Sequence, residues 1–177
     1  MPVNPSCTVV EFAEPSIFGE TCGYIVDDEQ GTLATRMTEI AEDSFPKLPR
    51  FYPSTFVAAF DSTSIDSRQV MGFCAISTDT VFGVRGMHIE MMCVAPLYRR
   101  QGVGRSIIDA AMGVGVALNE KQTDGRLVNC RVEVSRDRHS NDPVPVVAFY
   151  KSCGFVVEDR RGRSDLYLHK NLYTKRF

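Results

Sequence analysis

The chain of 177 residues is long enough to bury a hydrophobic core in one domain, and a second full domain would be cramped. Apolar residues make up 44% and charged residues 24%, a balance that excludes a disordered chain and is typical of a globular domain. The formal charge of -2 provides no basic field for a nucleic-acid backbone, so we expect no nucleic-acid partner. Residues 1–177 are therefore interpreted as a single domain.

The cysteines and the apolar segments favour a cytoplasmic protein. Six cysteines are scattered through the sequence: Cys7, Cys22, Cys74, Cys93, Cys130 and Cys153. They form no C-x-x-C pair and mostly lie in apolar runs, as reduced core residues do, so no metal site is predicted. No basic stretch followed by an apolar run opens the sequence, and no segment approaches the ~20 apolar residues of a membrane helix.

In the first half of the chain, the hydrophobic pattern predicts a strand, a helix and a hairpin. The segment from Thr8 to Phe12 alternates like a strand. The segment from Thr32 to Phe45 is predicted to be a helix that ends before Pro46 and Pro49. Its apolar face consists of Leu33, Met37, Ile40, Ala41 and Phe45. Two apolar runs between Phe56 and Ser77, separated by a polar turn, predict the hairpin.

The next strand is predicted at the centre of a sheet. The segment from Met87 to Val94 is apolar on both faces except at His88 and Glu90. After Pro96 comes an Arg/Gly-rich turn, and then apolar residues recur at helical spacing. This predicted helical face consists of Ile107, Ala111, Val114 and Leu118.

The last third predicts a strand, a short helix and a final hairpin. The segment from Leu127 to Val134 alternates as a strand, and a polar loop, residues 135–141, follows. A short helix is bounded at roughly Pro143 to Cys153, with Asp142 as its N-cap and Gly154 as its left-handed stop. Segments 155–158 and 166–169 suit a closing hairpin, and the element order indicates one mixed α/β domain.

The turn from Arg99 to Ser106 carries the strongest functional pattern. It joins a buried strand to a long helix whose first backbone N–H groups lack helical partners, and such an end attracts anions. Gly102 and Gly104 allow a phosphate to approach the backbone, and the arginines of the turn add charge. A P-loop is excluded because G-x-x-x-x-G-K-[ST] is missing, and a dinucleotide fingerprint because Ile107 replaces its third glycine.

Two motifs resemble the GNAT superfamily of acetyl-CoA-dependent N-acetyltransferases. The pattern [RQ]-x-x-G-x-[GA] after a buried strand is met by Arg99, Gly102 and Gly104. The later pattern A-x-x-F-Y-x-x-x-G-F corresponds to the segment from Val146 to Phe155, with Val146 in place of the alanine. With the order of elements, the resemblance spans about Thr8 to His169.

This resemblance implies a single domain with a mostly antiparallel sheet of six or seven strands, flanked by about four helices. It also implies that the central strand bulges and diverges from the next one, and that acetyl-CoA lies in the gap along the backbone of Met92, Cys93 and Val94. The residues expected to hold the pyrophosphate are Arg99, Arg100, Gln101, Gly102, Val103, Gly104, Arg105 and Ser106. Pro143 stands where many relatives carry an asparagine that contacts the cofactor.

The resemblance also suggests how the acetyl group is transferred. An alkyl amine with a pKa near ~10.4 is mostly protonated at neutral pH, so a base must take a proton before or during attack. Glu90 is the first candidate, since its H-I-E context resembles amino-sugar acetyltransferases, and His88 is the second. Tyr150 matches the family tyrosine that donates a proton to the departing thiolate. The alternatives are a carboxylate paired with arginine at Glu90 and a core tyrosine at Tyr150.

The expected reaction is direct acetyl transfer to a primary amine in a ternary complex, with a small amine such as an amino sugar favoured. A protein lysine or N-terminus is the alternative acceptor, and an inactive CoA-binding sensor is the alternative function. A homodimer is possible because dimers are common among relatives.

Overall fold

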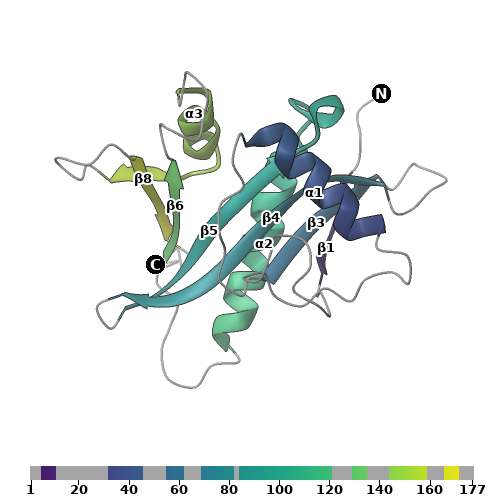
Figure 1. The fold of residues 1–177 in the computed structure, drawn as a ribbon. Helices are drawn as coiled ribbons and strands as arrows, with labels where there is room; N and C mark the ends of the chain where they lie inside the picture. Colours follow the sequence, from purple (N-terminus) through teal and green to yellow (C-terminus); the bar gives the residue numbers. More distant parts are fainter. Residues whose placement is uncertain are drawn as a thin grey trace.

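The computed structural model describes residues 5–10, 32–45, 55–61, 69–81, 84–120, 129–134, 144–158 and 166–171 (Figure 1). Its strands are β1 Pro5–Val10, β3 Thr55–Asp61, β4 Val70–Val81, β5 Val84–Val94, β6 Asn129–Val134, β7 Val156–Glu158 and β8 Leu166–Asn171. Its helices are α1 Thr32–Ser44, α2 Val103–Glu120 and α3 Val144–Ser152, with a short 3₁₀ helix, η1, at Pro96–Tyr98.

The seven strands form one sheet in the order β1-β3-β4-β5-β6-β8-β7. The pair β5 and β6 is parallel, and the other neighbouring pairs are antiparallel. The structure therefore confirms the expected mixed α/β domain with a mostly antiparallel sheet, and β5 occupies the predicted central position. The three described helices and η1 agree roughly with the expected four.

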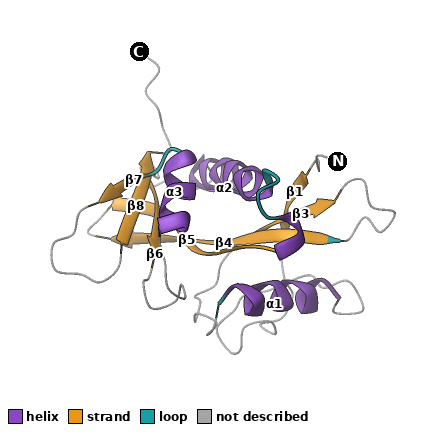
Figure 2. Ribbon diagram, turned by 90° about the horizontal axis from the view of Figure 1, so that it is seen from above, coloured by secondary structure: helices purple, strands orange, loops and turns teal. Residues whose placement is uncertain are grey.

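The helices cover the two faces of the sheet. Figure 2 shows α1 on one face, with α2 and α3 on the other. Each face has its own cluster of buried apolar residues, so the sheet separates two cores. None of the helices that the structure describes is long and apolar enough to span a bilayer.

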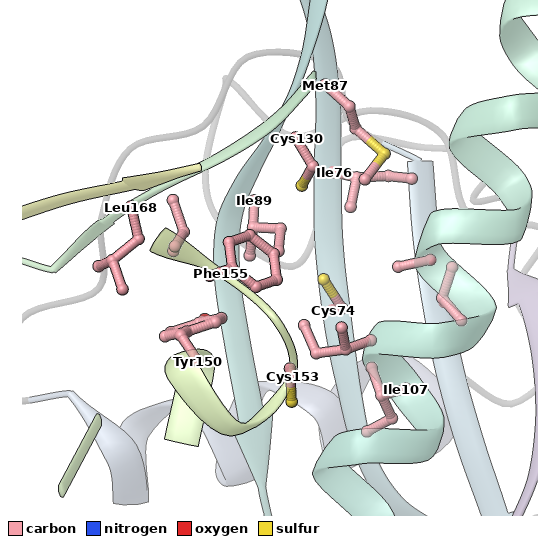
Figure 3. Packing of buried hydrophobic residues seen from close by; sticks show 14 of the residues in the cluster. Cys74, Ile76, Met87, Ile89, Ile107, Cys130, Tyr150, Cys153, Phe155 and Leu168 are labelled. Carbon is pink, nitrogen blue, oxygen red and sulfur yellow. The ribbon is translucent and has the colours of Figure 1, made fainter. Parts of the chain in front are cut away.

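The larger core joins the sheet to α2 and α3 (Figure 3). The residues labelled there are Cys74, Ile76, Met87, Ile89, Ile107, Cys130, Tyr150, Cys153, Phe155 and Leu168. Helix α2 lies close to β5 at Gly115, where a Cβ atom would come within 2.5 Å of Met87 Sδ. Each large apolar side chain buried here contributes roughly 1.5–3 kcal/mol of transfer free energy.

The smaller core confirms most of the predicted helical face of α1. Met37, Ile40 and Ala41 are buried there, and Phe45 packs against the cluster. Their partners on the sheet include Phe56 and Phe73, whose ring centroids lie 6.3 Å apart. The side chain of Leu33 lies outside the described part of the chain.

The observed strand limits differ from the predicted ones by a few residues, most clearly at the first strand and at β5. The first strand starts at Pro5 rather than Thr8 because six successive residues pair with β3, and residues 11–12 lie outside the described ranges. Strand β5 starts at Val84 because β4 and β5 continue as a hairpin to the pair Val81 and Val84. Segments 135–143 and 46–50, which held the predicted polar loop, N-cap and helix stops, also lie outside the described residues.

Candidate active site at the divergence of two strands

Strand β5 carries a bulge at the point where its parallel neighbour leaves it. Ala75 pairs with Met91 and Ile76 pairs with Ile89, so Glu90 is an extra residue in β5. Pairing of β5 with β6 ends at Ile89 and Val132, although β5 continues to Val94. The expected bulge and divergence of the central strand are therefore both present.

The backbone beyond this bulge offers hydrogen-bonding groups on the edge that β6 has left. The Ala95 N–H donates to the Met71 carbonyl of β4 at 2.9 Å. Successive N–H groups of a strand point to opposite edges, so those of Met92 and Val94 face away from β4. The Cys93 side chain is buried in the core beside α1, and by the same alternation its N–H faces β4, so the free edge presents the groups of Met92 and Val94 on either side of it. This free edge can pair with an extended ligand chain, as another strand would.

The turn after β5 adopts left-handed backbone at two positions before α2 begins. The φ angles are 62° at Arg100 and 86° at Gly102. The first hydrogen bond of the helical turn runs from Ser106 N–H to the Gly102 carbonyl at 3.1 Å. The N–H groups of Val103, Gly104 and Arg105 therefore precede the helical ladder and form the positive end of the helix dipole. This arrangement suits an anionic ligand.

Two of the three arginines of the turn hold the protein together. Arg99 Nε donates to the Val94 carbonyl at 2.9 Å. Arg105 donates to the Ser152 carbonyl at 2.6 Å, which ties the start of α2 to the end of α3. Arg100 is exposed and makes no hydrogen bond or ion pair with the described residues, so its charge is available to a ligand. The Gln101 amide donates to the Leu97 carbonyl at 2.6 Å.

The two positions of the motif require glycine for different physical reasons. Gly102 needs its positive φ, and a Cβ there would meet nothing within 4 Å. At Gly104 a Cβ would lie 3.2 Å from Phe149 Cζ, so this glycine allows α3 to pack on the start of α2. From the sequence, both glycines were expected to allow a phosphate to approach the backbone, and the close packing of Gly104 against Phe149 was missed.

Glu90 lies in a polar cluster on the face of the sheet that carries α1. Its carboxylate accepts a hydrogen bond from Ser77 Oγ of β4 and lies 3.1 Å from His88 Nδ1. The side chains of His88 and Glu90 are 28% and 19% exposed, so both remain accessible to a small molecule. The predicted first and second candidate bases are thus in direct contact. Ser77 was missed, because a serine near the end of an apolar run carries no functional pattern by itself.

Tyr150 is positioned by the C-terminal turn of α3. The Phe155 N–H donates to the Tyr150 carbonyl at 3.1 Å and the Gly154 N–H to the Lys151 carbonyl at 2.9 Å, which is a Schellman motif. Gly154 has a φ of 87°, as the sequence predicted. The rings of Tyr150 and Phe155 meet edge to face with centroids 5.3 Å apart. The F-Y-x-x-x-G-F pattern therefore fixes the position of the tyrosine at the end of α3.

The Tyr150 side chain belongs to the core between the sheet and the α2/α3 layer (Figure 3). It is 4% exposed, and burial raises its pKa well above the usual value. A phenol in this environment stays protonated. It is therefore suited to donating a hydrogen bond rather than to giving up its proton. Among the described residues, no group of three or more His, Cys, Asp or Glu side chains is placed to bind a metal ion.

The site thus has two sides separated by the sheet. His88 and Glu90 lie on the α1 face, whereas Tyr150 comes from α3 on the opposite face. The free edge of β5 lies between them. The candidate base and the candidate hydrogen-bond donor therefore lie on opposite sides of this edge.

The family is shown by comparison with known proteins. The acetyltransferase (GNAT) domain family matches residues 52–157, which include the bulged strand, the Arg/Gly turn and α3. The chain belongs to this family of acetyltransferases. No curated protein sequence matches it significantly.

Solved structures share the fold at low identity. Arabidopsis thaliana NAA60 in complex with a bisubstrate analogue has a TM-score of 0.60 and 14% identity, covering 94% of this chain and 98% of that one. AtaTR bound with acetyl-CoA has a TM-score of 0.57 and 14% identity, covering 95% and 93%. The NatC complex bound to Gag peptide and CoA has a TM-score of 0.51 and 18% identity, covering 67% and 71%.

Proposed function

We propose that this protein is an acetyl-CoA-dependent N-acetyltransferase that passes the acetyl group directly to a primary amine, with residues 1–177 acting as one domain. The observation that carries the proposal is the free edge of β5 beyond Glu90, which leads to the N-terminus of α2. An extended pantetheine suits the edge, and a pyrophosphate suits the helix end. The structures of AtaTR with acetyl-CoA and of NatC with CoA support the same ligand.

The free edge of β5 and the turn after it bind different parts of acetyl-CoA. The N–H groups of Met92 and Val94 pair with the thioester arm. The N–H groups of Val103, Gly104 and Arg105 and the hydroxyl of Ser106 bind the pyrophosphate. Arg100 adds a charge that the described protein leaves uncompensated. When bound, acetyl-CoA supplies an acyl carbon that is already activated for attack by an amine.

The chain's own residues then carry the proton transfers. Glu90 takes a proton from the amine, and His88 and Ser77 hold its carboxylate in place. The Met92 N–H stabilises negative charge on the acetyl oxygen. Tyr150 donates a hydrogen bond to the leaving sulfur, which is the role that its raised pKa favours.

A small amine is the preferred acceptor, and an amino sugar is the first example to test. A protein N-terminus is the second candidate. It is favoured by the likeness to NAA60 bound to a bisubstrate analogue and to NatC bound to a peptide. The acceptor is identified by measuring CoA release across amine classes.

Replacing Tyr150 by phenylalanine distinguishes an active acetyltransferase from an inactive CoA-binding sensor. For an enzyme, Tyr150→Phe should lower kcat by about 100-fold, the low end of the cost of removing one donor to a developing negative charge, with CoA affinity unchanged within about twofold. Tyr98→Phe, which removes a hydroxyl from a residue with no assigned role, is the matched control. Wild-type protein that binds CoA by calorimetry but releases none from acetyl-CoA with any amine would be a sensor instead.

A further inference from the structure

A row of polar side chains crosses four strands of the sheet beside the bulge. Ser77 of β4 pairs with His88 of β5, His88 pairs with Arg131 of β6, and Arg131 pairs with His169 of β8. Paired residues on neighbouring strands project to the same face and lie about 5 Å apart. The base candidates and Arg131 are therefore close neighbours across the point where β5 and β6 begin to diverge.

The row lies on the α1 face of the sheet, opposite the α2/α3 core. Met87 pairs with Cys130 and Ile89 with Val132, and all four side chains belong to that core. His88 and Arg131, which lie between these pairs, project to the opposite face. Helix α1 packs on β4 and β5 on that face, and Figure 2 shows no described helix beneath β6 and β8.

Arg131 is a half-buried cation with no partner among the described residues. Its Nε atom is buried and has no hydrogen-bond acceptor there, and its guanidinium makes no ion pair with any side chain that the structure describes. The titratable groups around it by register are His88 and His169 at its sides, Glu90 beside His88, and the exposed Glu133 two residues along β6. A partly desolvated charge without a partner costs stability, and an anionic ligand at this position offsets that cost.

We propose that Arg131 binds an anionic group of the acceptor, so that the substrate is a small primary amine carrying a carboxylate or a phosphate. The inference rests on the proposed acetyltransferase function and specifies its acceptor. The planar guanidinium binds carboxylate or phosphate oxygens through paired hydrogen bonds. With the anion held on β6, the amine reaches Glu90 and His88 on β5, one strand away. An amine a few bonds from its anion spans that distance.

Two pairs of amines separate the possible sources of the anion. Alanine is compared with alaninamide, and glucosamine 6-phosphate with glucosamine, by kcat/KM corrected for the fraction of neutral amine. We expect the anionic member of at least one pair to be preferred by about tenfold or more, the size of a hydrogen-bonded charge contact. The preferred pair tells a carboxylate acceptor from a phosphate acceptor.

Variants of Arg131 tie that preference to one side chain. Arg131→Gln should lose the preference, measured as the ratio of kcat/KM for the two members of the pair, and Arg131→Lys should keep part of it. Arg36→Gln is the matched control, because Arg36 pairs with Glu39 on the exposed side of α1. No anion preference in the wild type, or the same preference in Arg131→Gln, would overturn the inference.

A binding measurement distinguishes this failure from failure of the proposed function. The acetylated product of the preferred anionic amine, N-acetylalanine or N-acetylglucosamine 6-phosphate, should raise the Tm of wild-type protein but not of Arg131→Gln in the presence of CoA. If neutral amines are acetylated without an anion preference, only the acceptor inference fails. If acetyl-CoA neither stabilises the protein nor is consumed, both proposals fail. Acetylation of peptide N-termini alone would overturn the small-molecule acceptor.

Discussion

At the scale of single residues, the bulge at Glu90 decides which side chains meet. Before the bulge, Met87 and Ile89 face the α2/α3 core. After it, Met91 and Cys93 face the core beside α1, so the alternation has shifted by one residue. The shift interrupts the strand where β6 leaves it, and the polar cluster of Glu90, His88 and Ser77 lies at this interruption.

Substitutions in that cluster distinguish the catalytic base from the residues that position it. If Glu90 is the base, Glu90→Gln should lower kcat/KM by about 100-fold, because it keeps the shape and removes proton acceptance. His88→Gln and Ser77→Ala should cost less than about tenfold each, since each removes only one contact to the carboxylate. All three variants are measured with one amine acceptor and with CoA affinity as the folding control.

The opposite order would reassign the roles. A larger loss in His88→Gln than in Glu90→Gln would make the imidazole the base and Glu90 the group that orients it, because the two atoms lie 3.1 Å apart. Equal losses with unchanged CoA affinity would instead indicate that the pair acts as one unit.

The motif residues were predictable from sequence, but the residues that face them were not. Glu90, Tyr150 and the turn could be singled out because glycine spacing and strand context carry a local pattern. Arg131 could not, because an outward-facing arginine on an alternating strand has the pattern of a solvated charge. Its neighbours are set by the register between β5, β6 and β8, which no local pattern specifies.

At the scale of elements, α3 depends on the turn that ends it. Gly154 has a φ of 87°, and a Cβ there would make ordinary contact with the Lys170 side chain at 3.6 Å. The space is therefore sufficient, and the cost of another residue is conformational. Lys170 Nζ also donates to the Cys153 carbonyl at 2.8 Å, which joins this turn to β8.

Replacing Gly154 should destabilise the protein and weaken catalysis together. Gly154→Ala should lower the free energy of unfolding by about 1 kcal/mol or more, because alanine resists positive φ. Gly154→Asn should lose less, since asparagine tolerates this region. Denaturant unfolding measures the first effect, and kcat reports the displacement of Tyr150. Stability equal to wild type in Gly154→Ala would show that the turn tolerates a side chain.

The order of elements could be predicted from sequence, and part of the sheet order could not. The helices α1, α2 and α3 were placed within a few residues, because their apolar spacing and stops are local. The closing hairpin was also predicted. The sequence does not show that β8, rather than β7, pairs with β6, since either strand of a hairpin can join a sheet edge. That choice brings His169 beside Arg131.

At the scale of the whole molecule, the sheet separates two cores and leaves the site between them. The α1 side contributes the candidate base, and the α2/α3 side contributes Tyr150. Neither core alone contains the proposed chemistry, so the site depends on the folded sheet. Both cores also bury thiols, which gives the stability of the protein a particular dependence on alkaline pH.

The buried thiols should make the protein lose stability above about pH 9. Burial raises the pKa of Cys93 to about 12, and the pKa values of Cys74 and Cys130 are also raised by burial. Between about pH 9 and 12 the unfolded chain loses these protons while the folded chain retains them. The unfolded state then binds fewer protons, so stability falls as pH rises, by about 1.4 kcal/mol per pH unit for each fully titrating group.

Removing one thiol should change the slope of the free energy of unfolding against pH by a known amount. Cys93→Ala loses one titrating group, so its free energy of unfolding should fall with pH less steeply by about 1.4 kcal/mol per pH unit, although its stability at neutral pH is lower. Denaturant unfolding under reducing conditions at several pH values measures both slopes. Parallel slopes for the two proteins would mean that Cys93 ionises in the folded state as easily as in the unfolded chain, against its burial beside α1.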